Sequence, residues 1–453
     1  MKEIINRRLT HLQKGFLYLS ASFCCLQSCV NNSEDITNNY KIQELTINDM
    51  GHTIHHNNVF SKDDTWIVFD GRNDDTKIGE TSTIGIVNIH TGEEKIIYQT
   101  HEQTVYGPGV GAASFSPVDD RVIFIHGLAN ADSVKPYDMS RRVGVGIDIN
   151  APNKPFHYDA RDTKSPYTPG SLRGGTHSHC WSADGRMISF TYNDEFVDSD
   201  LRLVGVMVPI EKPIIVGKDS ANNDGNMLSA IVTDVVREPR WGSDEISKAF
   251  DECWVGSTNR IAFQGHTRNA KGDTVTEIYL VDIDEDMIKR DKDAVGQKGE
   301  RPHVPQGIRQ IRLSRTDKGL SDLRHWLRSS PDGRYIYALA KDEDGRNQIV
   351  QCDTHTGEVV FVSAFDFSVN SPINISYKGD KIAFLANNNV YIFDIESRIH
   401  ERITAFTEED LSVVGAPVFS RKGDRIAFNQ FVSVNGNENI QIKLIALRNT
   451  NRK

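Results

Sequence analysis

Short apolar runs separated by polar turns recur along the chain. In the stretch from Trp181 to Phe190 (WSADGRMISF), one strand ends, a turn of polar and glycine residues follows, and a second apolar strand begins. The pattern also occurs in segments 59–69, 114–124, 254–263, 328–339, 375–385 and 418–428. These alternations predict repeated β-hairpins.

Several copies are followed by a third and a fourth predicted strand, as in segments 84–98 and 347–363. Four-stranded units spaced by roughly 40–60 residues are typical of β-propellers. We therefore predict an all-β protein, a seven-bladed β-propeller of four-stranded blades over residues 43–450. A strand near Lys41–Ile47 is expected to pair with the last blade and close the ring.

The N-terminal residues are typical of a targeting segment. Basic residues precede the apolar run 15–26, which is too short to span a bilayer. The run ends in LQSC, which resembles a bacterial lipobox with lipid attached to Cys29, although Gln27 replaces the usual small residue. This predicts a signal peptide over residues 1–28 and a polar tether over 29–42, with ordinary cleaved secretion as the alternative. The acidic stretch 33–35 resembles the surface-export signal of Bacteroidetes lipoproteins.

These segments predict a protein of the cell envelope, periplasmic or on the outer-membrane surface, that contacts the membrane only through its lipid anchor. The net charge of −10 argues against nucleic-acid binding. Cys180, Cys253 and Cys352 are expected to be buried thiols, because their spacing matches no disulfide or metal motif. We expect a monomer.

Two long interruptions separate predicted strands. The proline-rich and polar segment 150–172 is predicted to act as a lid over a site. The highly charged segment 284–306 is predicted to be a solvated insertion.

Histidines recur at one registered position before the repeated turn. Counting back five residues from the turn serines Ser61, Ser182 and Ser330 gives His56, His177 and His325. Strand starts of a propeller gather around one mouth of its central channel, so we expect these imidazoles to converge there. His179 lies two residues after His177, and alternate strand residues share a face, which predicts two imidazoles about 7 Å apart. The ends of the following strands, including His126, are expected at the same mouth.

Converging neutral imidazoles are common ligands of Mn, Zn or Fe. His177, His179 and His325 are therefore predicted to hold a divalent transition metal. In the alternative interpretation, these histidines hydrogen-bond to one another and to water in the channel.

The repeated turns resemble those of TolB-like propellers, and segment 172–194 (LRGGTHSHCWSADGRMISFTYND) most resembles a TolB-like family of unknown function in Gram-negative bacteria. The His177–His179 pair also resembles the metal-binding histidine pair of oligogalacturonate lyase. That family has a glutamine ligand three residues before its pair, where this chain has Gly174. The resemblance implies a metal role for His177 and His179 alone.

Two functions follow from these interpretations. The first is a metal-dependent enzyme that cleaves acidic oligosaccharides by β-elimination at a uronate. His56 would be the base, and Arg173 or Arg324 would bind the carboxylate. Because the chain is acidic overall, the positive charge that binds the substrate has to be local. The second is a non-catalytic propeller that binds an envelope protein, a peptide or a glycan.

Overall fold

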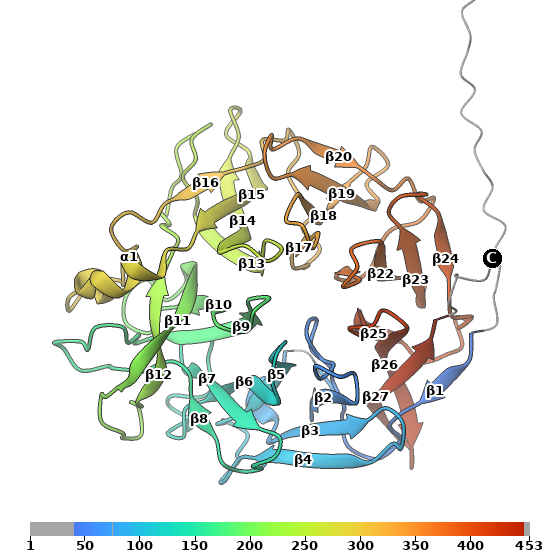
Figure 1. Cartoon of the computed structure of the whole chain (residues 1–453), viewed down its shortest axis with the longest axis horizontal. Helices are drawn as coiled ribbons and strands as arrows, with labels where there is room; N and C mark the ends of the chain where they lie inside the picture. The colour runs from blue at the N-terminus through green and yellow to red at the C-terminus, as the bar shows by residue number, and fades with distance from the viewer. Residues whose placement is uncertain (1–39, 75, 448–453) are drawn as a thin grey trace, which may run out of the picture. The chain divides into compact units, whose positions relative to one another are not determined.

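The computed structural model describes residues 40–74 and 76–447, which form seven β-sheets around a central axis (Figure 1). Each sheet is one blade, and in six of them the strands run in sequence order from the axis outwards, whereas in the seventh the N-terminal strand is outermost. The signal peptide, Cys29 and most of the predicted tether lie outside the described residues. The seven-bladed, all-β propeller predicted from the sequence is confirmed.

Every strand pairs antiparallel with its neighbours within a blade. In blade 1 two isolated bridges, Thr53 with Asp70 and Phe60 with Ile67, take the place of the innermost strand. The strands of blades 1 to 3 are β2 (Trp66–Asp70), β3 (Thr83–Asn88), β4 (Glu94–Gln99), β5 (Val110–Phe115), β6 (Arg121–Gly127), β7 (Arg142–Asp148), β8 (Phe156–His157), β9 (Gly175–Trp181), β10 (Ile188–Asn193), β11 (Arg202–Ile214) and β12 (Gly225–Ile231).

Blades 4 to 7 follow the same plan. Their strands are β13 (Lys248–Trp254), β14 (Arg260–Arg268), β15 (Thr274–Asp282), β16 (Gln310–Arg312), β17 (Arg328–Ser329), β18 (Tyr335–Lys341), β19 (Asn347–Asp353), β20 (Val359–Phe361), β21 (Asn374–Ile375), β22 (Lys381–Ala386), β23 (Asn389–Asp394), β24 (His400–Arg402), β25 (Val413–Phe419), β26 (Arg425–Val434) and β27 (Asn437–Ala446).

The N-terminal strand β1 (Ile42–Glu44) completes blade 7. It pairs with β27, opposite Lys443–Ile445, so the last blade contains both ends of the described chain (Figure 1). Leu45, which follows β1, is 5% exposed and packs in the core that blades 1 and 2 share with blade 7. The predicted closing strand is confirmed, and it covers the edge that β27 would otherwise expose.

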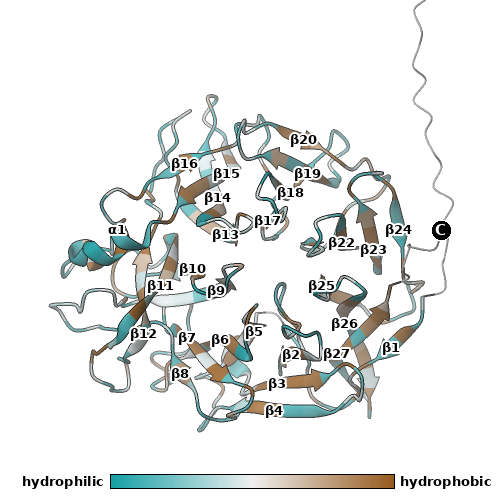
Figure 2. Ribbon diagram, viewed as in Figure 1, coloured by the Kyte–Doolittle hydropathy of each residue, from teal (hydrophilic) through white to brown (hydrophobic). Residues whose placement is uncertain are grey.

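Many strand residues are hydrophobic, as the brown segments of the ribbons in Figure 2 show, and large apolar side chains are buried between the blades. Six second strands have a fully buried phenylalanine eight residues after the first residue of the repeated turn: Phe69, Phe124, Phe190, Phe263, Phe384 and Phe428. In blades 1 and 3 this ring packs against a glycine of the next strand, Gly85 and Gly205, where an added Cβ would collide with it. The repeated pattern therefore specifies interlocking blade faces.

The two long interruptions are parts of the packed fold. Segment 150–172 contains β8, the outer strand of blade 2, and the buried residues Asp159 and Arg161. The lid expected there is therefore wrong. Segment 284–306 contains helix α1 (Glu285–Arg290) and the 3-10 turn η2 (Lys292–Val295); η1 (Ile78–Glu80) lies in blade 1. Ile288 of α1 is 1% exposed and packs in the core beside blade 3. Segment 284–306 is therefore partly buried, and the prediction of a solvated insertion is only partly right.

No helix among residues 40–74 and 76–447 is long and apolar enough to cross a membrane.

Ring closure by β1 can be tested by truncation. Deleting residues 1–46 removes the backbone pairing of β1 and the buried side chain of Leu45. We expect the midpoint of thermal unfolding to fall by about 5 °C, because burying a leucine contributes about 1.5–3 kcal/mol and exposed strand edges promote association. A chain lacking only residues 1–39 is the control. Equal midpoints for the two truncated chains would contradict a closing role.

Candidate functional site

Three neighbouring inner strands contain the same irregularity. Ala112, Ser178 and Asp251 occupy one registered position in β5, β9 and β13, with φ of 55°, 56° and 50°. In each strand the register shifts there, so that two residues oppose a single buried phenylalanine of the second strand. Such β-bulges redirect side chains and are frequent beside functional sites. The bulges therefore decide where the inner-strand side chains point.

The bulge at Ser178 separates the two predicted metal ligands. His177 pairs with Thr191, whose hydroxyl donates to Glu252 of blade 4 at 3.0 Å, so His177 shares the face toward blade 4. The Nε2 atom of His179 lies 3.1 Å from Thr176 Oγ1, on the face toward blade 2. The expectation that both imidazoles project from one face is wrong, because it assumed a regular strand.

His325 is a structural residue of blade 5. Its Nδ1 lies 2.7 Å from the Leu323 carbonyl, and its Nε2 accepts a hydrogen bond from the Leu339 amide at 3.1 Å. Ser371, the equivalent residue of blade 6, bonds to the Leu385 amide in the same way. Both imidazole nitrogens are therefore committed to the backbone, and the structure does not support His325 as a metal ligand.

Arg173 is also part of the scaffold. Its guanidinium is 1% exposed, pairs with Asp194 at 3.1 Å and donates to the Val295 and Glu300 carbonyls. It lies 4.3 Å from the centre of the Tyr167 ring. These contacts fasten segment 284–306 to blade 3 and leave the side chain committed away from the channel, so Arg173 does not fit a substrate-binding role.

His56 and Arg324 do come together, on the two sides of Trp326. The His56 ring stacks on Trp326 with centroids 3.6 Å apart, and the Arg324 guanidinium lies 4.5 Å from the centre of the same indole. The ring of His55 lies 4.0 Å from that of His56. The predicted convergence of blades 1 and 5 at the axis is therefore present, with His55 as an added member.

Arg328 holds these blades together at the axis. Its Nη2 donates to the His56 carbonyl at 3.0 Å, and its Nε donates to the Asn374 side chain at 2.8 Å. The Asn374 amide donates to the His56 and Pro417 carbonyls. One network thus joins blades 5, 6, 7 and 1.

Thr191 connects His177 with Glu252, because it lies opposite His177 in the sheet of blade 3 and donates to Glu252 of blade 4. Glu252 is 1% exposed and accepts the Thr191 hydrogen bond through Oε2, while its Oε1 has no partner among the described residues. Neither imidazole nitrogen of His177 has a partner there. Buried polar atoms normally find hydrogen bonds, so these unpartnered atoms suit a ligand or water. Burial raises the pKa of Glu252 to about 8 and lowers that of His177.

Basic side chains surround this pair. Arg142 and Arg202 begin the third strands of blades 2 and 3, and neither forms an ion pair with a described carboxylate. Arg142 donates to the Tyr137 hydroxyl at 2.8 Å, and the buried Nε of Arg202 has no partner in the described chain. After burial, these two charges and that of Arg324 lower the pKa of His177. Lys248 and Asp251 interact electrostatically with Arg202 and Arg324. We call the whole group the mouth cluster: His55, His56, Arg142, His177, Arg202, Lys248, Asp251, Glu252 and Arg324.

The sequence interpretation missed Arg142, Arg202, Asp251 and Glu252. The available signal was the acidic pair Asp251–Glu252 inside a strand of segment 248–254, where both residues are buried. Charged residues are almost never fully buried without a partner, so two adjacent acidic residues in a predicted inner strand indicate a functional site.

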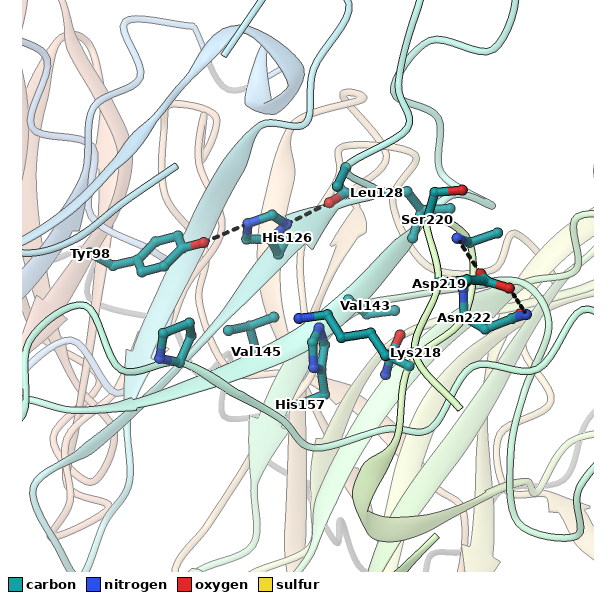
Figure 3. Close-up of a pocket in the computed structure, with 15 residues that line it drawn as sticks. Tyr98, His126, Leu128, Val143, Val145, His157, Lys218, Asp219, Ser220 and Asn222 are labelled. Atoms are coloured by element: carbon teal, nitrogen blue, oxygen red, sulfur yellow. Dashed lines mark hydrogen bonds between the residues drawn. The ribbon is translucent and has the colours of Figure 1, made fainter. Parts of the chain in front are cut away.

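His126 is not at the mouth. Its Nε2 lies 2.8 Å from the Tyr98 hydroxyl of blade 1, in a cavity of about 180 Å³ at the outer part of blade 2 (Figure 3). The His157 ring and Lys218 line the same cavity. The imidazole nitrogens of His126 form hydrogen bonds with the Tyr98 hydroxyl and the Gly127 carbonyl, which indicates a structural role.

The predicted metal ligands do not form a metal centre. Across residues 40–74 and 76–447, no three His, Cys, Asp or Glu side chains are grouped to hold a metal ion. His177 has free nitrogens, but His179 faces the other way and His325 is bonded to the backbone. The trio therefore does not fit.

Comparisons with known proteins agree with the fold. The uncharacterized protein YidR of Escherichia coli (strain K12) is 32% identical over 402 residues, which cover 85% of this chain and 94% of that protein. Residues 109–224 match a family described as a protein of unknown function, DUF3748.

Among solved structures, oligogalacturonate lyase in complex with manganese has a TM-score of 0.51 at 12% identity, covering 92% of this chain and 95% of its own. A putative TolB from Agrobacterium tumefaciens has a TM-score of 0.42 at 15% identity, covering 81% and 98%. The likeness to the lyase extends to the fold alone.

The structural role of His325 predicts a pH effect. Burial lowers its pKa to about 4, whereas the unfolded chain titrates near pH 6.5. Between these values the unfolded state binds more protons, so this residue reduces stability as the pH falls from about 6.5 to 4, by up to about 3 kcal/mol. His325→Gln keeps an acceptor and removes the titration. From urea unfolding at pH 7 and pH 5, we expect the free energy of unfolding to fall less between the two pH values in the variant than in the wild type. Equal falls in the two proteins would contradict this role.

Proposed function

The chain belongs to the YidR family, and from its geometry we propose that it is a cell-envelope protein whose mouth cluster binds an acidic oligosaccharide and cleaves it by β-elimination at a uronate. The observation that carries the proposal is the buried pair His177 and Glu252, with unpartnered polar atoms, beside two arginines that form no ion pair with a described carboxylate. The local positive charge that an acidic chain needs for an anionic substrate is present there.

The arginines would bind the uronate carboxylate. Arg202 and Arg142 carry guanidinium groups that match a carboxylate with two parallel hydrogen bonds. Arg324 contributes charge from blade 5 and keeps the role assigned to it from the sequence. Neutralising the carboxylate acidifies the adjacent C–H bond and stabilises the enediolate that forms.

His177 and Glu252 supply the proton transfers. His177 would take the proton from the carbon next to the carboxylate, the carbon–carbon double bond would form, and the bond to the leaving oxygen would break. Glu252, protonated below about pH 8, would give its proton to that oxygen. A bound carboxylate offsets the arginine charges that depress the pKa of His177 and makes it a better base. His177 replaces His56 as the proposed base, because the Nδ1 of His56 lies 3.0 Å from Arg328.

Glu252→Gln tests the acid role. We expect the rate of unsaturated-uronate formation, followed by ultraviolet absorbance on a panel of acidic oligosaccharides, to fall at least about 100-fold. The wild-type rate should decline above about pH 8, where Glu252 loses its proton. A variant that retains full activity would remove Glu252 from the mechanism.

Arg202→Gln tests carboxylate binding. We expect KM for the same substrates to rise about tenfold or more, since a charge-assisted hydrogen bond contributes about 1.5–3 kcal/mol. Arg260→Gln is the control, because Arg260 lies on the surface and pairs with Asp282. Saturable binding of an acidic glycan without absorbance gain would favour the second function predicted from the sequence, a non-catalytic propeller that binds a glycan, peptide or envelope protein.

Metal content separates this proposal from the metal-dependent one. The two free nitrogens of His177 favour a metal there, whereas the orientations of His179 and His325 oppose the predicted trio. We expect elemental analysis of the untagged protein to find no stoichiometric Mn, Zn or Fe. A stoichiometric metal that is lost in His177→Ala would replace the arginine-based proposal by a metal-based one.

A further inference from the structure

A cavity lies at the end of the inner strands opposite the mouth cluster. It encloses about 370 Å³ between the inner strand ends and the turns that follow them. All seven blades contribute, from Asn57 of blade 1 to Phe419 of blade 7. We call it the turn-end cavity. Its volume falls in the range of small-molecule sites.

The charged residues that line the turn-end cavity are all positive. Arg328 and Arg421 line the cavity, and no aspartate or glutamate does, although the whole chain has 62 acidic and 52 basic residues. Arg328 is 6% exposed and donates only to neutral acceptors of blades 1, 5 and 6. The Nε of Arg421 donates to the Ser61 carbonyl, and its buried Nη2 has no partner in the described chain. Neither guanidinium forms an ion pair with a described carboxylate.

The buried Arg328 and the partly buried Arg421 form no ion pair with a described carboxylate, which favours an anion beside them. Removing a charged group from water is costly unless an opposite charge or strong hydrogen bonds compensate for it. A carboxylate between the arginines would provide that compensation through charge-assisted bonds.

Four aromatic residues, including Tyr377, lie in the remaining wall among serine, asparagine and small apolar residues. Trp181 and Trp254 come from equivalent positions of blades 3 and 4, and Phe419 comes from blade 7. The Trp254 indole is fixed by a hydrogen bond of 2.9 Å to the Cys180 carbonyl. Fixed aromatic rings bind flat apolar groups at little entropic cost.

We propose that the turn-end cavity binds a small organic acid that carries an apolar ring, with its carboxylate at Arg421 and Arg328 and its ring against the aromatic residues of the wall. Arg328 contacts His56 of the mouth cluster, but no member of that cluster lines the cavity, and the proposal does not depend on the function proposed for the cluster.

Calorimetry with two probes of the same shape tests the proposal. Phenylacetate carries the carboxylate, and phenylacetamide replaces it by a neutral amide. We expect saturable binding of phenylacetate at millimolar or lower concentration, and at least tenfold weaker binding of the amide. Arg421→Gln should weaken phenylacetate binding at least tenfold. Arg425→Gln should leave it unchanged, because Arg425 follows the same turn, pairs with Asp424 and does not line the cavity.

Three results would overturn the proposal. These are equal affinities for acid and amide, unchanged affinity in Arg421→Gln, and no saturable binding of phenylacetate or of the larger indole-3-acetate. A competition experiment with inorganic phosphate is a further test. If phosphate displaces phenylacetate with an affinity equal to that of phenylacetate, the site does not recognise the ring, and the assigned ligand class is wrong. Arg202→Gln should bind phenylacetate normally, so failure of the mouth proposal and failure of this one give different results.

Discussion

The structure depends on closing seven twisted sheets into one ring. Each blade is apolar on both faces and is stable only between two neighbours, so no blade can be left at an open end. The short strand β1 meets this requirement by pairing with β27. Arg328 and Asn374 join blades 5, 6, 7 and 1 at the axis. This closure brings the inner strands of different blades together around the axis.

The channel differs at its two ends. At the mouth, imidazoles, two carboxyl groups and several arginines gather where the inner strands begin. At the other end, tryptophans, thiols and two arginines line the turn-end cavity. Both ends are locally basic within a chain of net charge −10, so the acidic residues are mainly distributed elsewhere. Both proposals accordingly place an anionic ligand at the axis of a chain whose net charge is negative.

Equivalent positions in different blades serve different purposes. His325 and Ser371 both bond to a backbone amide of the second strand, so the imidazole there replaces a hydroxyl in a structural contact. His177 occupies a bulged strand, where its nitrogens remain without protein partners in the described chain. The bulge at Ser178 explains the orientation of His179, because it turns the side chain that follows to the opposite face.

The sequence by itself determined the ring. Seven repeated hairpins, the periodic apolar positions and the N-terminal strand are local patterns, and local patterns specify blades and their order. It also determined that His56 and Arg324 meet, because both precede an inner strand. Only the tertiary structure decided which polar groups face each other. A single left-handed residue at Ser178 reversed the direction of His179, and packing against segment 284–306 occupied Arg173. Glu252 and Arg202 acquired their relation to His177 from the contact between two blades, which sequence spacing does not encode.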